Sequence, residues 1–167
     1  MIIKKEKPMK IKCIAVGKIK EKFYRQAIEE FQKRLSKYCK LEIIEVADEK
    51  TPDKAGDKIN EQIKDVEGGR ILKYIKENDY VVALAIDGQA VTSEQLAAKI
   101  EKLGINGNSS IAFIIGGSLG LSSEVLEKAD YQMSFSAMTF PHQLMRVILL
   151  EQVYRSFRII SGEPYHK

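Results

Sequence analysis

Three glycines and a serine follow an apolar run in the second half of the chain. The stretch IAFIIGGSLGL, residues 111–121, places Gly116, Gly117, Ser118 and Gly120 directly after IAFII. Glycine can adopt a positive φ and lets a ligand approach main-chain N–H and C=O groups. The spacing matches neither the dinucleotide fingerprint G-x-G-x-x-G nor the P-loop, which needs a Lys-Ser/Thr pair. By itself the stretch therefore leaves both a ligand-binding loop and an ordinary tight turn open.

Groups that can exchange a proton gather near the carboxyl-terminal end. The chain ends in Tyr165, His166 and Lys167, and His142 stands at the start of a long apolar pattern. A neutral imidazole can accept a proton near pH 7, so either His is a candidate general base. A structural hydrogen-bond donor is the alternative role for His142, and a frayed end is the alternative for the tail.

Positive charge is concentrated near the amino-terminal end. The net charge is +4, but residues 10–40 contain ten Lys or Arg and three Glu, a local +7. Residues 41–70 contain five basic and nine acidic side chains, a local −4. A segregated basic surface is typical of proteins that bind a polyanion, although a solvated lysine-rich helix face produces the same pattern.

Length and composition indicate one globular domain. The chain has 167 residues, of which 44% are hydrophobic and 30% charged. We expect residues 1–8 to form a disordered leader and residues 9–167 to form a single domain. No apolar run is long enough to span a membrane and no secretory signal is present, which favours a cytoplasmic protein. Cys13 and Cys39 have no ligand-like neighbours, so we expect buried reduced thiols and no metal site.

Strand and helix patterns alternate along this domain. The expected strands cover 10–16, 41–47, 80–86, 111–115 and 131–135. The expected helices cover 23–38, 59–75 with a loosening at Gly68-Gly69, a segment from Thr92 to Gly104, 122–129 and 141–160. Asp87-Gly88 is expected to form a turn that closes the third strand, and Thr92 with Gln95 fits a capping box. Several strands are continuously apolar, which predicts an α/β fold with a mostly parallel sheet and helices on both faces.

Three of these strands end in segments that could form one site. Ligands of open parallel sheets bind at the carboxyl ends of the strands. The marked ends are Leu84-Ala85-Ile86, the glycine turn at 116–118, and the segment 135–140. We expect the three segments to be walls of a single ligand site.

The last helix pattern, 141–160, is apolar around nearly its whole circumference. One face of a sheet cannot bury all of these side chains, so the pattern predicts a homodimer through this helix. Its charged exceptions, Arg146, Glu151, Arg155 and Arg158, are then either rim residues of that interface or residues of the site.

Three segments closely resemble the bacterial family of ribosomal RNA large-subunit methyltransferase H. They are IIGGSLGL, SFSAMTFPHQLMRVILLEQVYRSFRIISGEPYHK and IKCIAVGKIKEKFYRQAIEEFQKRL, and the resemblance extends from Met9 to Lys167. Members of that family are small SPOUT-superfamily enzymes that transfer a methyl group from S-adenosylmethionine to N3 of a pseudouridine in 23S ribosomal RNA, on assembled ribosomes. The resemblance implies an α/β fold with a carboxyl-terminal trefoil knot, and a homodimer.

The resemblance also implies where the cofactor and the acceptor base bind. It implies S-adenosylmethionine contacts at Leu84, at Gly116 with Gly117 in the glycine turn, and along 135–140, namely Phe135, Ser136, Ala137, Met138, Thr139 and Phe140. The imide N3–H of the acceptor must lose its proton before or during transfer, and nearby cations stabilise the resulting charge. We expect His166 and Tyr165 to shape the acceptor side, reaching into the partner's site, with Arg155 as an electrostatic helper. His142 remains the competing base.

The basic segment is the expected contact with ribosomal RNA. Lys18, Lys20, Lys22 and Arg25 are our candidates for phosphate contacts, which add salt dependence but read no sequence. Two other functions stay open: a knotted dimer that docks on ribosomes without methylating them, and a nucleotide-dependent oxidoreductase. The absence of G-x-G-x-x-G disfavours the oxidoreductase.

Overall fold

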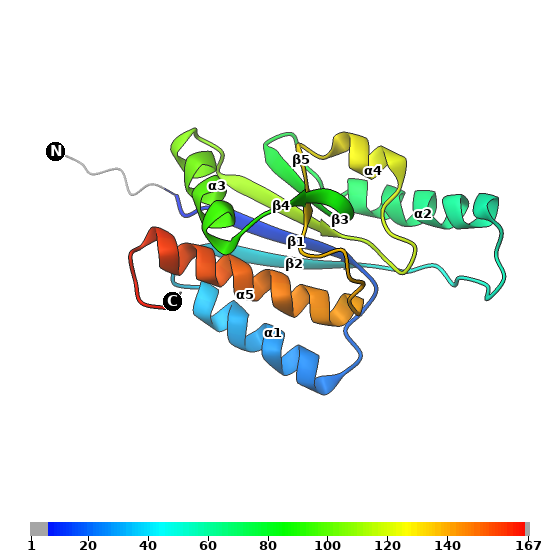
Figure 1. Cartoon of the computed structure of the whole chain (residues 1–167), viewed down its shortest axis with the longest axis horizontal. Coiled ribbons are helices and arrows are strands. Elements are labelled where there is room, and N and C mark those ends of the chain that lie inside the picture. The colour runs from blue at the N-terminus through cyan, green and yellow to red at the C-terminus, as the bar shows by residue number, and fades with distance from the viewer. Residues whose placement is uncertain (1–6, 166–167) are drawn as a thin grey trace.

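A five-stranded parallel sheet forms the centre of the computed structural model, which describes residues 7–165 (Figure 1). The strands lie in the order β2-β1-β4-β3-β5, and each neighbouring pair is parallel. Their bounds are β1 Lys10–Val16, β2 Lys40–Val46, β3 Asp79–Ala90, β4 Ser110–Ile115 and β5 Tyr131–Ser134. The predicted parallel α/β fold is therefore confirmed, whereas the trefoil knot stays a prediction.

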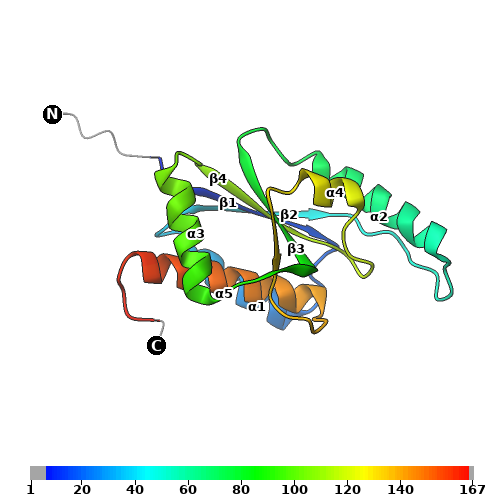
Figure 2. The ribbon, with the colours of Figure 1, turned by 45° about the horizontal axis from the view of Figure 1, so that its top comes forward.

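Helices cover both faces of the sheet, as the continuously apolar strands predict. On one face lie α1 (Lys22–Leu35), α3 (Ser93–Ile105) and α5 (His142–Ile160), and on the other lie α2 (Asp57–Leu72) and α4 (Ser123–Lys128) (Figures 1 and 2). Helices α1 and α5 run side by side in the same direction, and both begin at the carboxyl edge of the sheet (Figure 1). Within the described residues, no helix is long and apolar enough to cross a membrane.

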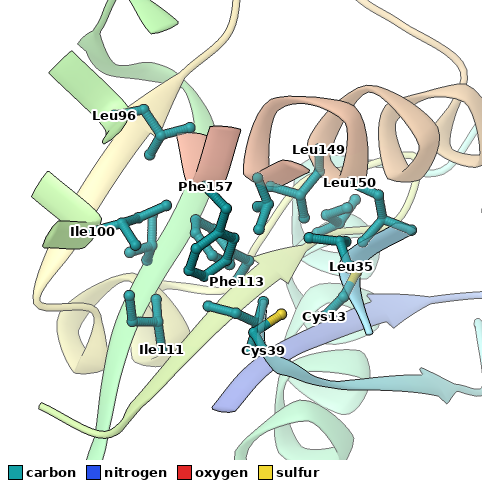
Figure 3. Close-up of a cluster of buried hydrophobic side chains, with 14 of the residues drawn as sticks. Cys13, Leu35, Cys39, Leu96, Ile100, Ile111, Phe113, Leu149, Leu150 and Phe157 are labelled. Carbon is teal, nitrogen blue, oxygen red and sulfur yellow. The ribbon is translucent and has the colours of Figure 1, made fainter. Parts of the chain in front are cut away.

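The larger core lies between the sheet and the α1, α3 and α5 layer (Figure 3). Phe113 of β4 packs there with Leu149 and Phe157 of α5. Cys13 and Cys39 are free thiols buried in the same cluster, and burial raises the pKa of each to about 12. Both thiols are therefore protonated at neutral pH, and their burial as free thiols agrees with the expectation of buried, reduced cysteines.

The predicted turn at Asp87-Gly88 is wrong, because β3 continues through it to Ala90. Leu84 and Gln89 both pair with Met133 of β5, so the ladder contains a bulge between them. A Cβ on Gly88 would lie 2.8 Å from backbone atoms of β5. The glycine therefore permits a close approach of two strands, which a local sequence pattern does not distinguish from a turn.

The predicted loosening at Gly68-Gly69 is also wrong, because α2 is continuous from Asp57 to Leu72. A Cβ on Gly68 would lie 2.3 Å from the Ser122 Oγ, whereas a Cβ on Gly69 would meet nothing within 4 Å. Gly68 is thus a contact point between α2 and the start of α4.

Helix α5 is covered on more sides than its sequence suggests. Every residue of α5 is buried or partly buried, and both α1 and α3 pack against it. Leu144, Ile148 and Ile159 are partly exposed and lie outside the core cluster. Helices α1 and α3 thus bury part of the apolar surface of α5 that we expected a partner subunit to bury. The homodimer stays a prediction. Two predicted helix ends are confirmed: Thr92 and Gln95 form the capping box of α3, and Gly162 has φ +65° just past α5. Helices α1 and α2 end at Leu35 and Leu72, three residues before the expected ends.

Candidate functional site

A cavity of about 420 Å³ opens at the carboxyl edge of the sheet, beside residues 84–87 of β3 and the ends of β4 and β5. All three segments expected as walls contribute to it: 84–86, 116–118 and 135–140. Every residue predicted to hold the cofactor lines this cavity except Ala137. Other lining residues are Asp87, Ile115, Leu119, Gly120, Leu121, Leu126, Gln132, Met133, Ser134, His142 and Met145. The structure thus brings three distant segments together, and their role in holding a cofactor stays a prediction.

The glycine turn owes its shape to contacts within the turn itself. Gly117 and Gly120 form an isolated antiparallel bridge, with the Gly120 N–H donating to the Gly117 carbonyl at 3.0 Å. Gly120 has φ +88°, in the left-handed region, and a Cβ on Gly116 would lie 2.8 Å from the Gly120 carbonyl carbon. Gly116 and Gly120 are therefore required for the loop to fold back on itself over the end of β4.

A buried carboxylate packs against this turn. Glu67 of α2 is only 4% exposed, and a Cβ on Gly117 would lie 3.0 Å from its Oε1. The Glu67 Oε2 accepts a hydrogen bond from the Glu49 N–H at 3.2 Å. Burial raises the pKa of Glu67 despite that hydrogen bond. Sequence reasoning missed this residue, although a carboxylate between Ile63 and Ile71 on the apolar stripe of α2 was the available signal.

Serine side chains shape the wall that follows β5. The Ser134 Oγ donates to the Ser136 carbonyl at 3.1 Å, and the Ser136 Oγ accepts from the Met138 N–H at 3.0 Å. Met138 lines the cavity and is 72% exposed, so an apolar side chain stands at its mouth. The wall is thus an ordered, irregular segment, with backbone groups free of a strand ladder at the edge of the cavity.

His142 lies at the first position of α5 and lines the cavity. Burial, and to a smaller extent the charge of Arg146, lowers the pKa of its imidazole below the ordinary value of 6.5. The ring is therefore neutral at pH 7 and able to accept a proton.

Arg146 is a buried structural cation, so its predicted place on the rim of a dimer or in the site is wrong. Its side chain donates to the carbonyls of Val16 at 3.0 Å and Gly17 at 2.7 Å, and pairs with Glu45 at 2.7 Å. The residue is 1% exposed. It joins the first turns of α5 to the carboxyl ends of β1 and β2. The sequence of α5 alone does not show that these two strands are its partners.

The tail lies along the carboxyl-terminal half of α5, away from the cavity of its own chain. The Tyr165 ring packs on Tyr154 with centroids 4.9 Å apart, and the Arg155 guanidinium lies 4.6 Å from the Tyr165 centroid. Glu151 pairs with Arg155 at 2.6 Å and forms a 3.2 Å hydrogen bond with the Tyr165 hydroxyl. Tyr165 and Arg155 thus come together, but neither lines the cavity with His142, and His166 lies outside the described residues.

Glu163 anchors this tail to both α1 and α5. Its carboxylate accepts a hydrogen bond from the Tyr38 hydroxyl at 2.8 Å and pairs with Arg158 and, at 3.5 Å, with Lys37. Arg158 also donates to the Pro164 carbonyl at 2.9 Å. The position of Tyr165 therefore depends on contacts from two helices.

The basic residues chosen from the sequence lie at the same edge of the sheet as the cavity. Lys18, Lys20, Lys22 and Arg25 are all exposed, in the connection from β1 to α1 and in the first turn of α1. Their role in RNA binding stays a prediction. Among residues 7–165, no three His, Cys, Asp or Glu side chains are grouped so that they could hold a metal ion.

Comparison with known proteins gives close relatives over nearly the whole chain. The family model described as "Predicted SPOUT methyltransferase" matches residues 9–166. Ribosomal RNA large subunit methyltransferase H from Clostridium botulinum (strain Langeland) is 64% identical over 159 residues, covering 95% of this chain and 100% of that protein. Proteins of the same name from Bifidobacterium adolescentis and Clostridioides difficile are each 63% identical with the same coverage.

A solved structure shares the fold at low sequence identity. A probable methylase family protein from Haemophilus influenzae Rd KW20 superposes with a TM-score of 0.51 at 13% identity, covering 94% of this chain and 70% of that chain. This similarity concerns the fold alone.

Proposed function

Because the chain belongs to the SPOUT methyltransferases, in the family of ribosomal RNA large subunit methyltransferase H, we propose that it methylates large-subunit ribosomal RNA. More closely, we propose that S-adenosylmethionine is the methyl donor, N3 of a pseudouridine in 23S ribosomal RNA the acceptor, and the assembled ribosome the substrate. The names of the relatives support ribosomal RNA as the substrate. The resemblance described above supports the methyl donor, the acceptor atom and the assembled ribosome. A ribosomal substrate would place the protein in the cytoplasm.

The observation that carries this proposal is the cavity at the carboxyl edge of the sheet, between β3 and the ends of β4 and β5. Its volume of about 420 Å³ lies within the range of small-molecule sites. Leu84, Phe135 and Phe140 offer apolar surface for an adenine ring, Thr139 offers a hydroxyl, and the Asp87 carboxylate complements a positive charge. These groups fit a nucleoside joined to a charged amino acid, so we propose that Leu84, the Gly116-Gly117 turn and segment 135–140 hold S-adenosylmethionine.

The neutral imidazole of His142 is a candidate proton acceptor in this cavity. When bound, S-adenosylmethionine supplies an electrophilic methyl group on a sulfonium sulfur. The acceptor N3–H must give up its proton so that the nitrogen lone pair can react. His142 lines the cavity with a lowered pKa, so it can take that proton at a ring nitrogen near neutral pH.

We propose that the tail serves the cavity of a second copy of the chain. Tyr165 contacts Tyr154, which follows His142 by 12 residues of α5, or about 18 Å along the helix. In a homodimer through α5, the tail of one protomer can reach the partner's cavity. There Tyr165 and His166 would shape the acceptor side and Arg155 would stabilise developing negative charge, with His142 or His166 as the base.

Transfer of labelled methyl from S-adenosylmethionine to ribosomes that lack the native modification tests the proposed reaction. We expect label on a single pseudouridine of the large subunit, more on joined ribosomes than on free subunits. No label despite cofactor binding in a calorimetric titration would refute the enzyme and favour a non-catalytic knotted dimer that docks on ribosomes.

A mixture of two inactive variants tests whether the tail acts on a partner's cavity. Thr139→Arg fills the mouth of the cavity from an exposed position, and deletion of 165–167 removes the tail. Random mixing makes half of the dimers mixed, each with one intact cavity facing one intact tail, so we expect about a quarter of wild-type activity. No recovery in the mixture would show that the tail does not act across the dimer.

A further inference from the structure

An aromatic side chain is exposed within the basic segment that begins α1. Phe23 is 60% exposed, and its ring centroid lies 4.4 Å from that of Tyr24 at an interplanar angle of 51°. A single exposed apolar side chain is ordinary in a soluble protein. Two features distinguish Phe23 from such a side chain: the cations around it, and the hydrogen bonds that link its segment to the cavity wall through α5.

The cations around Phe23 form no ion pairs with described residues. Lys18, Lys20, Lys22 and Arg25 are exposed, and among the described residues none of the four takes part in an ion pair. The first turn of α1 contains no acidic side chain, although the helix dipole favours one there. With Glu21 at the N-cap as the acidic residue among them, the four cations give this surface an excess of positive charge.

The first turn of α5 joins this surface to the cavity. The Gln143 Oε1 accepts hydrogen bonds from the Lys20 N–H at 2.8 Å and the Glu21 N–H at 3.2 Å. Gln143 directly follows His142, which lines the cavity. One turn further along α5, Arg146 holds the Gly17 carbonyl. The basic segment and the cavity wall are thus fixed to the same helical turns.

We propose that Phe23 and Tyr24, with the surrounding cations, form a platform on which an unpaired base of the RNA substrate stacks beside the cavity. This inference rests on the function proposed above. Stacking of a base on an aromatic ring is tolerant of sequence, and cations next to the ring bind the flanking phosphates. The platform would hold a nucleotide near the target while the target base enters the cavity.

The charge on this surface favours RNA over a second copy of the chain. In a two-fold symmetric contact, the same patch of each copy faces the other. A dimer through Phe23 would therefore bring four unpaired cations of each copy together, which is electrostatically unfavourable. A nucleic acid strand offers the opposite charge and an aromatic face in every nucleotide.

Binding of a short labelled single-stranded RNA, and of a duplex of the same length, tests the platform by fluorescence anisotropy. We expect Phe23→Ala to weaken binding of the single strand by roughly 5- to 150-fold, the loss typical of one stacked base, and binding of the duplex far less. Phe23→Trp should retain the affinity, and Phe23→Leu should behave like Phe23→Ala because leucine has no aromatic face. Tyr74→Ala, which removes a 44% exposed aromatic ring between α2 and β3, is the matched control and should change nothing.

Salt dependence separates stacking from charge. Phe23→Ala should leave the slope of log affinity against log salt unchanged, whereas Lys20→Ala should reduce its magnitude by about 0.7. Wild-type affinity in Phe23→Ala or in Phe23→Leu would overturn the platform. A Phe23→Ala protein that becomes monomeric in sedimentation would overturn it as well, by assigning the ring to a protein interface.

The methylation assay distinguishes failure of this inference from failure of the proposed function. On ribosomes, Phe23→Ala should raise KM and leave kcat and the calorimetric affinity for S-adenosylmethionine unchanged. If wild-type protein transfers methyl and Phe23→Ala has an unchanged KM, the platform is wrong and the function stands. If wild-type protein transfers no methyl but binds single-stranded RNA through Phe23, the function is wrong and the RNA surface stands.

Discussion

Removal of the Arg146 guanidinium should cost a large part of the stability of this protein. In Arg146→Met the hydrocarbon volume is retained, while the Val16 and Gly17 carbonyls lose charged donors at 3.0 and 2.7 Å. Hydrogen bonds from charged groups contribute about 1.5–3 kcal/mol each, and such losses are not fully additive. The Glu45 side chain is 36% exposed and recovers hydration, so its share of the loss is small. We therefore expect a loss of about 3–5 kcal/mol in the free energy of unfolding.

Chemical denaturation at constant pH measures this loss, and thermal unfolding checks it. A loss of 3–5 kcal/mol corresponds to a fall in Tm of about 6–20 °C for a domain of this size. Arg25→Met, at an exposed arginine of α1, is the matched control and should change stability by less than about 0.5 kcal/mol. Arg146→Met should also raise the pKa of His142, because the charge of Arg146 helps to lower it.

Two results would refute this account of Arg146. A loss below about 1 kcal/mol would show that the two carbonyls find other donors, such as water, at little cost. Equal losses in Glu45→Gln and Arg146→Met would show that the ion pair, and not the pair of carbonyls, carries the stabilisation.

Two further predictions concern α2 and His142. Gly68→Ala should destabilise the fold by about 1–2 kcal/mol, because its Cβ would lie 2.3 Å from the Ser122 Oγ, whereas Gly69→Ala should stabilise it by up to about 1 kcal/mol. Equal effects on urea midpoints would contradict this. The lowered pKa of His142 means that the unfolded chain binds a proton near pH 6.5 before the folded chain does. Wild-type stability should therefore fall as the pH drops from 7 through the folded-state pKa, and this fall should shrink in His142→Gln; identical pH profiles of the two proteins would exclude the effect.

Local patterns in the sequence were enough to predict the fold class and the location of the cavity. The continuously apolar strands predicted a parallel sheet covered on both faces, and the structure has this arrangement. Parallel strands end at the same edge of a sheet, so the segments at 84–86, 116–118 and 135–140 could be assigned to one cavity from the sequence, although β3 itself continues past 84–86 to Ala90. The capping box at Thr92 could also be predicted from the sequence, because all of its atoms lie within one helical turn.

Only the tertiary structure identified the residues whose partners are distant in the chain. Arg146 pairs with Glu45, which precedes it by 101 residues, and Glu67 supports the turn at Gly117. From the sequence, Arg146 suggested either the rim of an interface or the site, and Gly88 suggested a turn. In both cases the local pattern is the same whether the neighbour is water or another strand. Hydrophobic periodicity shows which face of an element is buried, but strand order and register decide which groups that face meets.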